Sequence, residues 1–150
     1  MEDNAIFSPL SEELKSWVQD QLVLLSNYAV AFDLVLSDKF TSSKLDQLWM
    51  LWKDSGTNDS DSTDSFLNCF GIGFGTLLIN ELGFEWALLK DEYGTDLAVR
   101  ALPGTANTRI APLHFVLKRW ETKENEFVEH SLKEIESFLH EQAEEHGIKL

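Results

Sequence analysis

Residues 84–101 read FEWALLKDEYGTDLAVRA, and they break the helical pattern of the rest of the chain. Apolar side chains recur there at every second position on both sides of a turn: Phe84, Trp86 and Leu88, then Leu97, Val99 and Ala101. A period of two is typical of a strand with one buried face. Residues 90–94 supply turn chemistry, and Gly94 can take a positive φ. The stretch predicts a β-hairpin. Residues 108–111 predict a third strand, since a lone hairpin is only marginally stable.

The segments on either side of this hairpin have the spacing of helices. On the N-terminal side we expect a long helix over 14–36, or two helices with a break near 26–27, and a second helix that ends before Gly56. Residues 66–82 are apolar on most sides and predict a buried helix. Its three glycines would allow another backbone to approach closely: Gly71, Gly73 and Gly75.

Two more helices are expected after the hairpin. Pro112 suits the first turn of a short helix. The last helix has an apolar stripe, widened by Phe127 and Phe138, with glutamates on its other faces. The prediction is an α+β fold with N-terminal helices, a buried glycine-containing helix, a small antiparallel β-hairpin or three-stranded sheet, and C-terminal helices.

A length of 150 residues suits one domain, 1–150. Residues 55–65 contain no apolar side chain and four acidic or amide residues, so they predict a mobile acidic loop. We do not expect a domain boundary at this loop, because the helices before it are too small to bury their own apolar faces.

The net charge of −14 restricts the partners of the chain. Nucleic acids and anionic membranes attract clustered basic residues, and here the basic residues are scattered. The acidity favours either plain solubility or a basic protein partner. Cys69 is the one cysteine, and the N-terminus has no signal-peptide pattern, so we expect a cytoplasmic protein. The apolar segment 66–82 is more consistent with a core helix than with a membrane span.

No catalytic, metal-binding or cofactor-binding motif is complete. Thr76 stands where a dinucleotide fingerprint needs its third glycine, and Glu144 stands where a zinc-protease helix needs its second histidine. The acids at 59–64 lack the glycine and the final glutamate of a calcium loop. The sequence therefore predicts no enzyme, no metal and no cofactor.

The remaining candidates for binding are polar and aromatic residues of the hairpin and the loop after it: Trp86, Asp91, Glu92, Tyr93, Arg100 and Arg109. Either arginine can bind an anionic ligand through two hydrogen bonds, or can form an ordinary ion pair with one of the turn acids. The indole of Trp86 can stack on a ligand, but its phase favours the core.

Residues 71–120 resemble an uncharacterised bacterial family known only as a domain of unknown function. The resemblance rests on a set of residues spread over this range: Gly75, Leu82-Gly83-Phe84-Glu85-Trp86, Asp91-Glu92-Tyr93-Gly94-Thr95-Asp96-Leu97-Ala98-Val99, Pro112 and Lys118-Arg119. It implies a bacterial origin and a helix–hairpin–helix α+β arrangement. It implies no activity.

Three functions remain open at this point. The first is a non-catalytic interaction module that binds a basic protein, as acidic immunity proteins do with basic toxins. The second is a small-molecule or anion-binding protein, or an unusual enzyme, with a pocket beside the hairpin. The third is a self-associating module, for example a homodimer, because Trp49, Trp52 and Trp120 exceed what a small core must bury.

Overall fold

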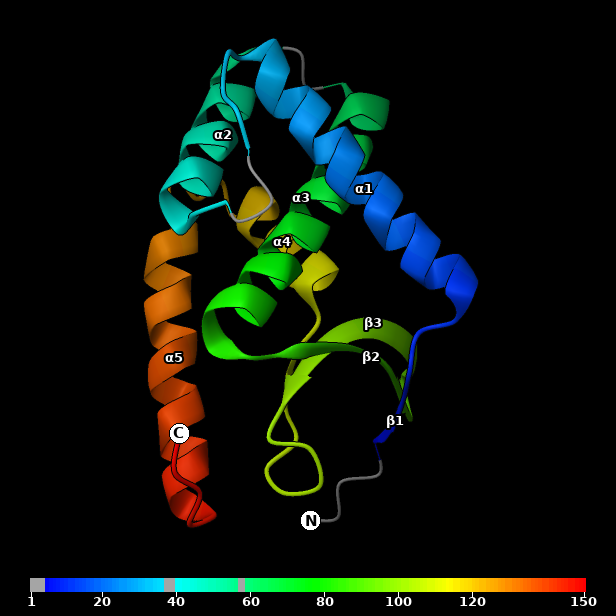
Figure 1. The fold of residues 1–150 in the computed structure, drawn as a ribbon. Coiled ribbons are helices and arrows are strands. Elements are labelled where there is room, and N and C mark those ends of the chain that lie inside the picture. The colour runs from blue at the N-terminus through cyan, green and yellow to red at the C-terminus, as the bar shows by residue number, and fades with distance from the viewer. Residues whose placement is uncertain (1–4, 37–39, 57–58) are drawn as a thin grey trace.

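The computed structural model describes residues 5–36, 40–56 and 59–150. Within them five helices and a four-stranded sheet form an α+β fold, which confirms the predicted class. In chain order the elements are β1 (Ile6–Ser8), α1 (Glu12–Ala31), α2 (Ser42–Asp54), α3 (Ser60–Leu82), β2 (Glu85–Asp91), β3 (Gly94–Ala101), β4 (Thr108–Ile110), α4 (Pro112–Glu121) and α5 (Val128–Glu145). Figure 1 shows α3 in the middle of the helices and the sheet near its C-terminal end.

The sheet is antiparallel throughout, in the order β1-β2-β3-β4. The predicted hairpin is confirmed, with Asp91 opposite Gly94 at the turn and Glu85 opposite Arg100 at the far end. Gly94 has a φ of 124°, a conformation that other residues rarely adopt. The expected third strand is β4. The β1 strand was not predicted, because three residues are too few to show an alternation.

The α3 helix is the core of the molecule, and its glycines lie where three other elements contact it. A Cβ atom at Gly71 would lie 2.8 Å from the Leu113 side chain of α4, and one at Gly73 would lie 2.4 Å from Leu25 of α1. A Cβ atom at Gly75 would lie 2.5 Å from the Trp86 ring of β2. The expected close approach is therefore confirmed on three sides.

By length and composition, α3 is the one described helix that could cross a membrane. However, 61% of its apolar window is buried inside the fold, as in the core helix of a globular protein.

The start of α3 corrects the prediction for residues 55–65. The helix begins at Ser60, so the loop prediction is wrong from that residue onward. The Asp59 carboxylate caps the helix by accepting a hydrogen bond of 2.8 Å from the Ser62 N–H, and Asp61 in the first turn complements the helix dipole. Polar residues suit both a loop and the cap and first turn of a helix, so composition alone does not distinguish the two. Residues 57 and 58 lie outside the described residues.

The N-terminal helix also ends earlier than expected. The α1 helix runs without a break near residues 26–27, but it stops at Ala31, and Asp33 has a φ of 59°. The apolar residues after it follow helical spacing without being helical. They pack against the core from an irregular segment that includes Phe32, Leu34 and Leu36.

The tryptophans lie inside the molecule, so the predicted exposed aromatic patch is wrong. Trp49 and Trp52 are buried, and Trp120 is half-buried. The Trp52 ring stacks on Phe66 at 4.5 Å between centroids, and Trp49 meets Trp120 edge to face at 5.6 Å. The core thus uses more aromatic side chains than we expected, because α2, α3 and α4 contribute rings to one cluster. The burial of these tryptophans removes the reason, drawn from the sequence, to expect self-association.

Candidate functional site

Trp86 belongs to the core, as its phase indicated. It lies on the face of the sheet turned toward α3, where its ring lies against Gly75. The same ring joins the main core to a second apolar cluster around Val18 and Ile72. The indole therefore connects the sheet to the helices.

The candidate residues of the hairpin turn point into solvent. The Asp91 carboxylate accepts a hydrogen bond of 2.9 Å from the Tyr93 N–H, a local contact that stabilises the turn. Glu92 is exposed, and Tyr93 is 89% exposed. The turn and the Arg100 end of the hairpin are separated by six residues of strand, about 20 Å at the usual rise. The structure does not bring these residues together with the arginines.

The two candidate arginines do lie together, on the sheet face turned away from α3. Arg100 and Arg109 are directly opposite each other on β3 and β4. Both guanidinium groups lie over the ring of Phe7 of β1, at 4.6 and 5.6 Å from its centroid. Arg100 forms an ion pair with Glu85, at 3.4 Å. The sequence had suggested Asp91 or Glu92 as its partner. Phe7 and Glu85 also belong to this cluster, and neither was predicted from the sequence as a binding residue.

The Glu85 partner was within reach of the sequence. Once the turn fixes Asp91 opposite Gly94, counting back along both strands places Glu85 opposite Arg100. Phe7 offered no such signal, because its strand was not recognised.

Four shallow hollows are lined by described residues, and none of these four touches the six candidates. One lies on α5, one between α2 and the start of α5, one between α1 and α3, and one between α3 and α4. The pocket expected beside the hairpin is not one of them.

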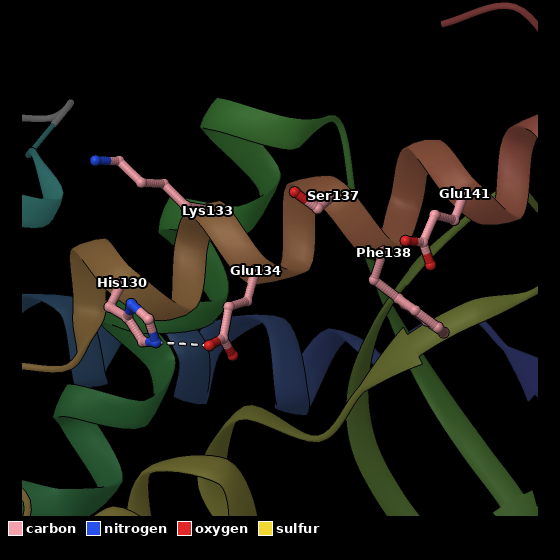
Figure 2. A pocket seen from close by; sticks show the side chains of 6 residues that line it. All are labelled: His130, Lys133, Glu134, Ser137, Phe138 and Glu141. Carbon is pink, nitrogen blue, oxygen red and sulfur yellow. Dashed lines mark ion pairs between the residues drawn. The ribbon is translucent and has the colours of Figure 1, made fainter.

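The hollow on α5 combines acidic groups with an exposed aromatic ring (Figure 2). We name the side chains that line it the α5 face: His130, Lys133, Glu134, Ser137, Phe138 and Glu141. Phe138 is 50% exposed, so its predicted place in the buried stripe is wrong. It lies on the flank of that stripe, four residues from Glu134 and three from Glu141, which places both carboxylates on its side of the helix.

The segment that carries the α5 face is the most acidic part of the chain. Between residues 121 and 145 there are nine glutamates and two lysines, and the nine are Glu121, Glu124, Glu126, Glu129, Glu134, Glu136, Glu141, Glu144 and Glu145. His130 forms an ion pair with Glu134 at 2.6 Å, and Lys133 forms one with Glu129 at 3.8 Å. Glu136, Glu141 and Glu144 form no ion pair with any described residue.

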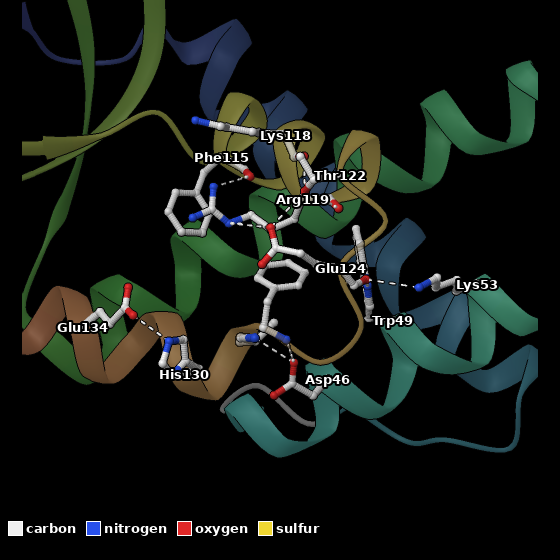
Figure 3. Close-up of polar contacts among 12 residues, drawn as sticks. Asp46, Trp49, Lys53, Phe115, Lys118, Arg119, Thr122, Glu124, His130 and Glu134 are labelled. Carbon is white, nitrogen blue, oxygen red and sulfur yellow. Dashed lines mark hydrogen bonds and ion pairs between the residues drawn. The ribbon is translucent and has the colours of Figure 1, made fainter.

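The first turn of α5 is held by a buried carboxylate from α2 (Figure 3). Oδ1 of Asp46 accepts hydrogen bonds from the N–H groups of Phe127 and Val128 at 2.9 and 2.7 Å, and Oδ2 accepts one from Glu129 at 3.0 Å. These are the N–H groups that a helix leaves without internal partners. The α5 face is therefore on a helix that is firmly attached to the core.

A second set of contacts holds the loop before α5 (Figure 3). The Trp49 indole donates a hydrogen bond of 3.0 Å to the Glu124 carbonyl, and the Lys53 ammonium donates one of 2.7 Å to the Asn125 side chain. Arg119 lies over the Phe115 ring, 3.6 Å from its centroid.

The described residues offer no metal centre. No group of three His, Cys, Asp or Glu side chains there could hold a metal ion. Burial raises the pKa of the Cys69 thiol to about 12, so it is a poor nucleophile near neutral pH.

Comparison with known proteins gives the family. The pattern of a family described as Domain of unknown function (DUF3806) matches residues 44–130, more than half of the chain. The chain belongs to this family. The match contains the resemblance seen at residues 71–120 and extends it to α2 and the start of α5. No curated protein matches the chain.

A solved structure supports the fold. A protein of Bacteroides thetaiotaomicron VPI-5482 superposes with a TM-score of 0.66 over 89% of this chain, at 15% sequence identity. At that identity the likeness concerns the fold alone. The chain spans about half of that protein, 47% of its length.

Proposed function

We propose that this chain is a non-catalytic protein-interaction module that binds a basic protein through the α5 face. The observation that carries the proposal is the position of Phe138, a half-exposed ring between Glu134 and Glu141. Binding surfaces commonly combine an aromatic anchor with a polar rim. The buried free thiol of Cys69 suits a reducing compartment such as the cytoplasm.

Charge supports a basic partner for this surface. The chain has 26 acidic and 12 basic residues, and the surplus is large around α5. An acidic patch attracts a basic partner during encounter and repels acidic ones, while the apolar anchor supplies affinity once the two surfaces meet. Phe138 and the carboxylates therefore have separate roles, which experiments can distinguish.

The attachment of α5 supports a preformed binding surface. Asp46 fixes the first turn of the helix, and Ile135 and Leu139 bury its inner stripe. A surface that is already ordered loses little conformational entropy on binding.

The test uses a defined probe, a short helical peptide with lysines around one central leucine. We expect the protein to bind it in isothermal titration calorimetry, with an affinity that falls as salt screens the exposed charges. Phe138→Ala should weaken binding by roughly tenfold, as expected for a central aromatic contact. The same peptide with glutamate in place of lysine should not bind.

Two control variants make the test specific to the α5 face. Val23→Ala removes an apolar side chain that is 62% exposed on α1, and it should leave binding unchanged. Glu12→Gln with Glu13→Gln alters net charge as much as Glu134→Gln with Glu141→Gln, but on α1. If both pairs weaken binding equally, the attraction is nonspecific and the α5 face is not the site.

A further inference from the structure

We infer that the hollow between α2 and the start of α5 is a binding site for a primary alkylammonium group. Its ligand is an ammonium on an apolar stem, which is the chemistry of a lysine side chain and of a free aliphatic diamine. The hollow shares no described lining residue with the α5 face, and the inference does not rest on the proposed function.

The lining of this hollow combines acidic groups with apolar ones. It includes the carboxylates of Asp46, Glu126 and Glu129 and the apolar side chains of Met50 and Leu51. The described residues that line it include no lysine, arginine or histidine. An alkylammonium chain packs its methylenes on apolar surface and keeps its charged end among polar groups. The two kinds of lining therefore match the two parts of such a ligand.

Asp46 supplies a buried carboxylate that can accept one more hydrogen bond. The residue is 7% exposed and lines the hollow. A carboxylate has about four acceptor positions, and here N–H groups occupy two on Oδ1 and one on Oδ2. Asp46 forms no ion pair with any described residue. A cation in the hollow can therefore use the remaining position on Oδ2 and balance the buried charge.

The other two carboxylates are available to the same cation. Glu126 is exposed and forms no ion pair within the described part of the chain. Glu129 pairs with Lys133 through one contact of 3.8 Å, between side chains that are 58% and 76% exposed. A long contact between exposed groups contributes little to stability. A bound ammonium can therefore compete with Lys133 for Glu129.

The spacing of the acidic groups favours an ammonium over a metal ion. No three His, Cys, Asp or Glu side chains among the described residues are grouped closely enough to hold a metal ion. An ammonium group has three N–H donors, and these can reach acceptors that lie apart from one another.

Met50 allows binding to be measured by NMR in the full chain. It is one of two methionines, so isotope labelling of the methionine methyl groups gives a simple spectrum. We expect butylammonium chloride to shift the Met50 methyl signal saturably, and sodium chloride at the same ionic strength to leave it unshifted. Butanol has the same stem without the charge and should bind about tenfold more weakly. Methylammonium should bind about fourfold more weakly for each methylene that the longer stem buries.

Four variants locate the bound ammonium. Glu126→Gln removes a carboxylate from the hollow and should weaken butylammonium binding by roughly two- to fivefold. Glu136→Gln makes the same change of charge elsewhere on α5 and should have no effect. Lys133→Gln removes the internal competitor and should strengthen binding. Phe138→Ala should leave binding unchanged, so a failure of this site and a failure of the α5 face can be told apart.

Two further probes distinguish the sources of the ammonium group. Acetyl-lysine methylamide represents the side chain of a protein, and putrescine represents a free diamine, so the tighter binder identifies the source. A Met50 shift that sodium chloride reproduces would overturn the proposal. Equal losses of binding in Glu126→Gln and Glu136→Gln would also overturn it, because they would show only a general attraction of cations to an acidic protein.

Discussion

Asp46 is a buried polar side chain whose loss we expect to destabilise the fold. Asp46→Ala would leave three N–H groups at the start of α5 without their acceptors, two of them in a buried setting. We expect a loss of roughly 3 kcal/mol in the free energy of unfolding, measured by urea denaturation. Asp46→Asn keeps one carbonyl oxygen and should cost less.

Asp59 provides the comparison for Asp46, because it caps α3 from an exposed position within its own chain segment. Asp59→Ala should cost about 1 kcal/mol, as usual for an N-cap. If the Asp46 variant loses no more stability than the Asp59 variant, the bridge between α2 and α5 contributes no more than an ordinary helix cap.

Cys69 gives a pH dependence with a definite sign. Its pKa is raised from 9.0 to about 12 by burial, so above pH 9 the unfolded chain releases a proton that the folded chain retains. The contribution of the buried thiol is therefore full below pH 9 and falls as pH rises toward 12. We expect the unfolding free energy of the wild type to fall more steeply over this window than that of Cys69→Ala. Parallel curves would show that the thiol is accessible to water.

Gly75 determines how closely the sheet approaches α3. In an open helix a change from glycine to alanine would stabilise by about 1 kcal/mol. Here the new Cβ would lie 2.5 Å from the Trp86 ring and 3.1 Å from Pro112, and neither ring can bend away. Gly75→Ala should therefore lower the free energy of unfolding by a net of about 1 to 3 kcal/mol. Circular dichroism should record this as a lower melting temperature.

Gly73→Ala is the matched variant in the same helix. Its new Cβ would meet the far end of the Leu25 side chain, which can rotate, so the loss should be smaller. Equal losses for both variants would mean that the rigidity of the neighbour does not control the outcome.

At the scale of elements, the sequence predicted those helices and strands whose apolar residues recur at a regular spacing. The hairpin was predictable because seven to eight residues alternate on each side of a glycine turn. The β1 strand was not, because it has three residues. Phe138 was misplaced because the spacing of α5 puts it on the flank of the buried stripe, where neighbouring elements and not periodicity decide exposure. Asp46 could not be identified, since its partners lie more than 80 residues away.

At the scale of the molecule, the sequence predicted the α+β fold class and the family of the chain, but it did not predict how the candidate residues are distributed over the surface and the core. The candidate residues were chosen on the hairpin, and the structure divides them among the core, the turn and the arginine pair. Contacts between segments that are distant in the sequence decide which of these places each residue occupies. The acidic surface of α5 was visible in the composition, but its exposed ring was not.

The charge of the whole molecule allows stability and binding to be separated. The chain carries a net charge of −14, and self-repulsion of that size opposes the compact state. Glu141 and Glu145 are four residues apart on α5, which has no basic residue in its last turn to balance the helix dipole. Changing both to glutamine should raise the unfolding free energy by about 0.5 to 1 kcal/mol.

The same double variant should bind the basic peptide more weakly, because it removes carboxylates from and beside the α5 face. Urea denaturation and titration calorimetry on one protein sample then give changes of opposite sign in stability and in affinity. A surface whose acids only confer solubility would gain stability without losing affinity. That result would remove the α5 face as a binding site, since the acidic groups would then have no effect on the interaction that they are proposed to serve.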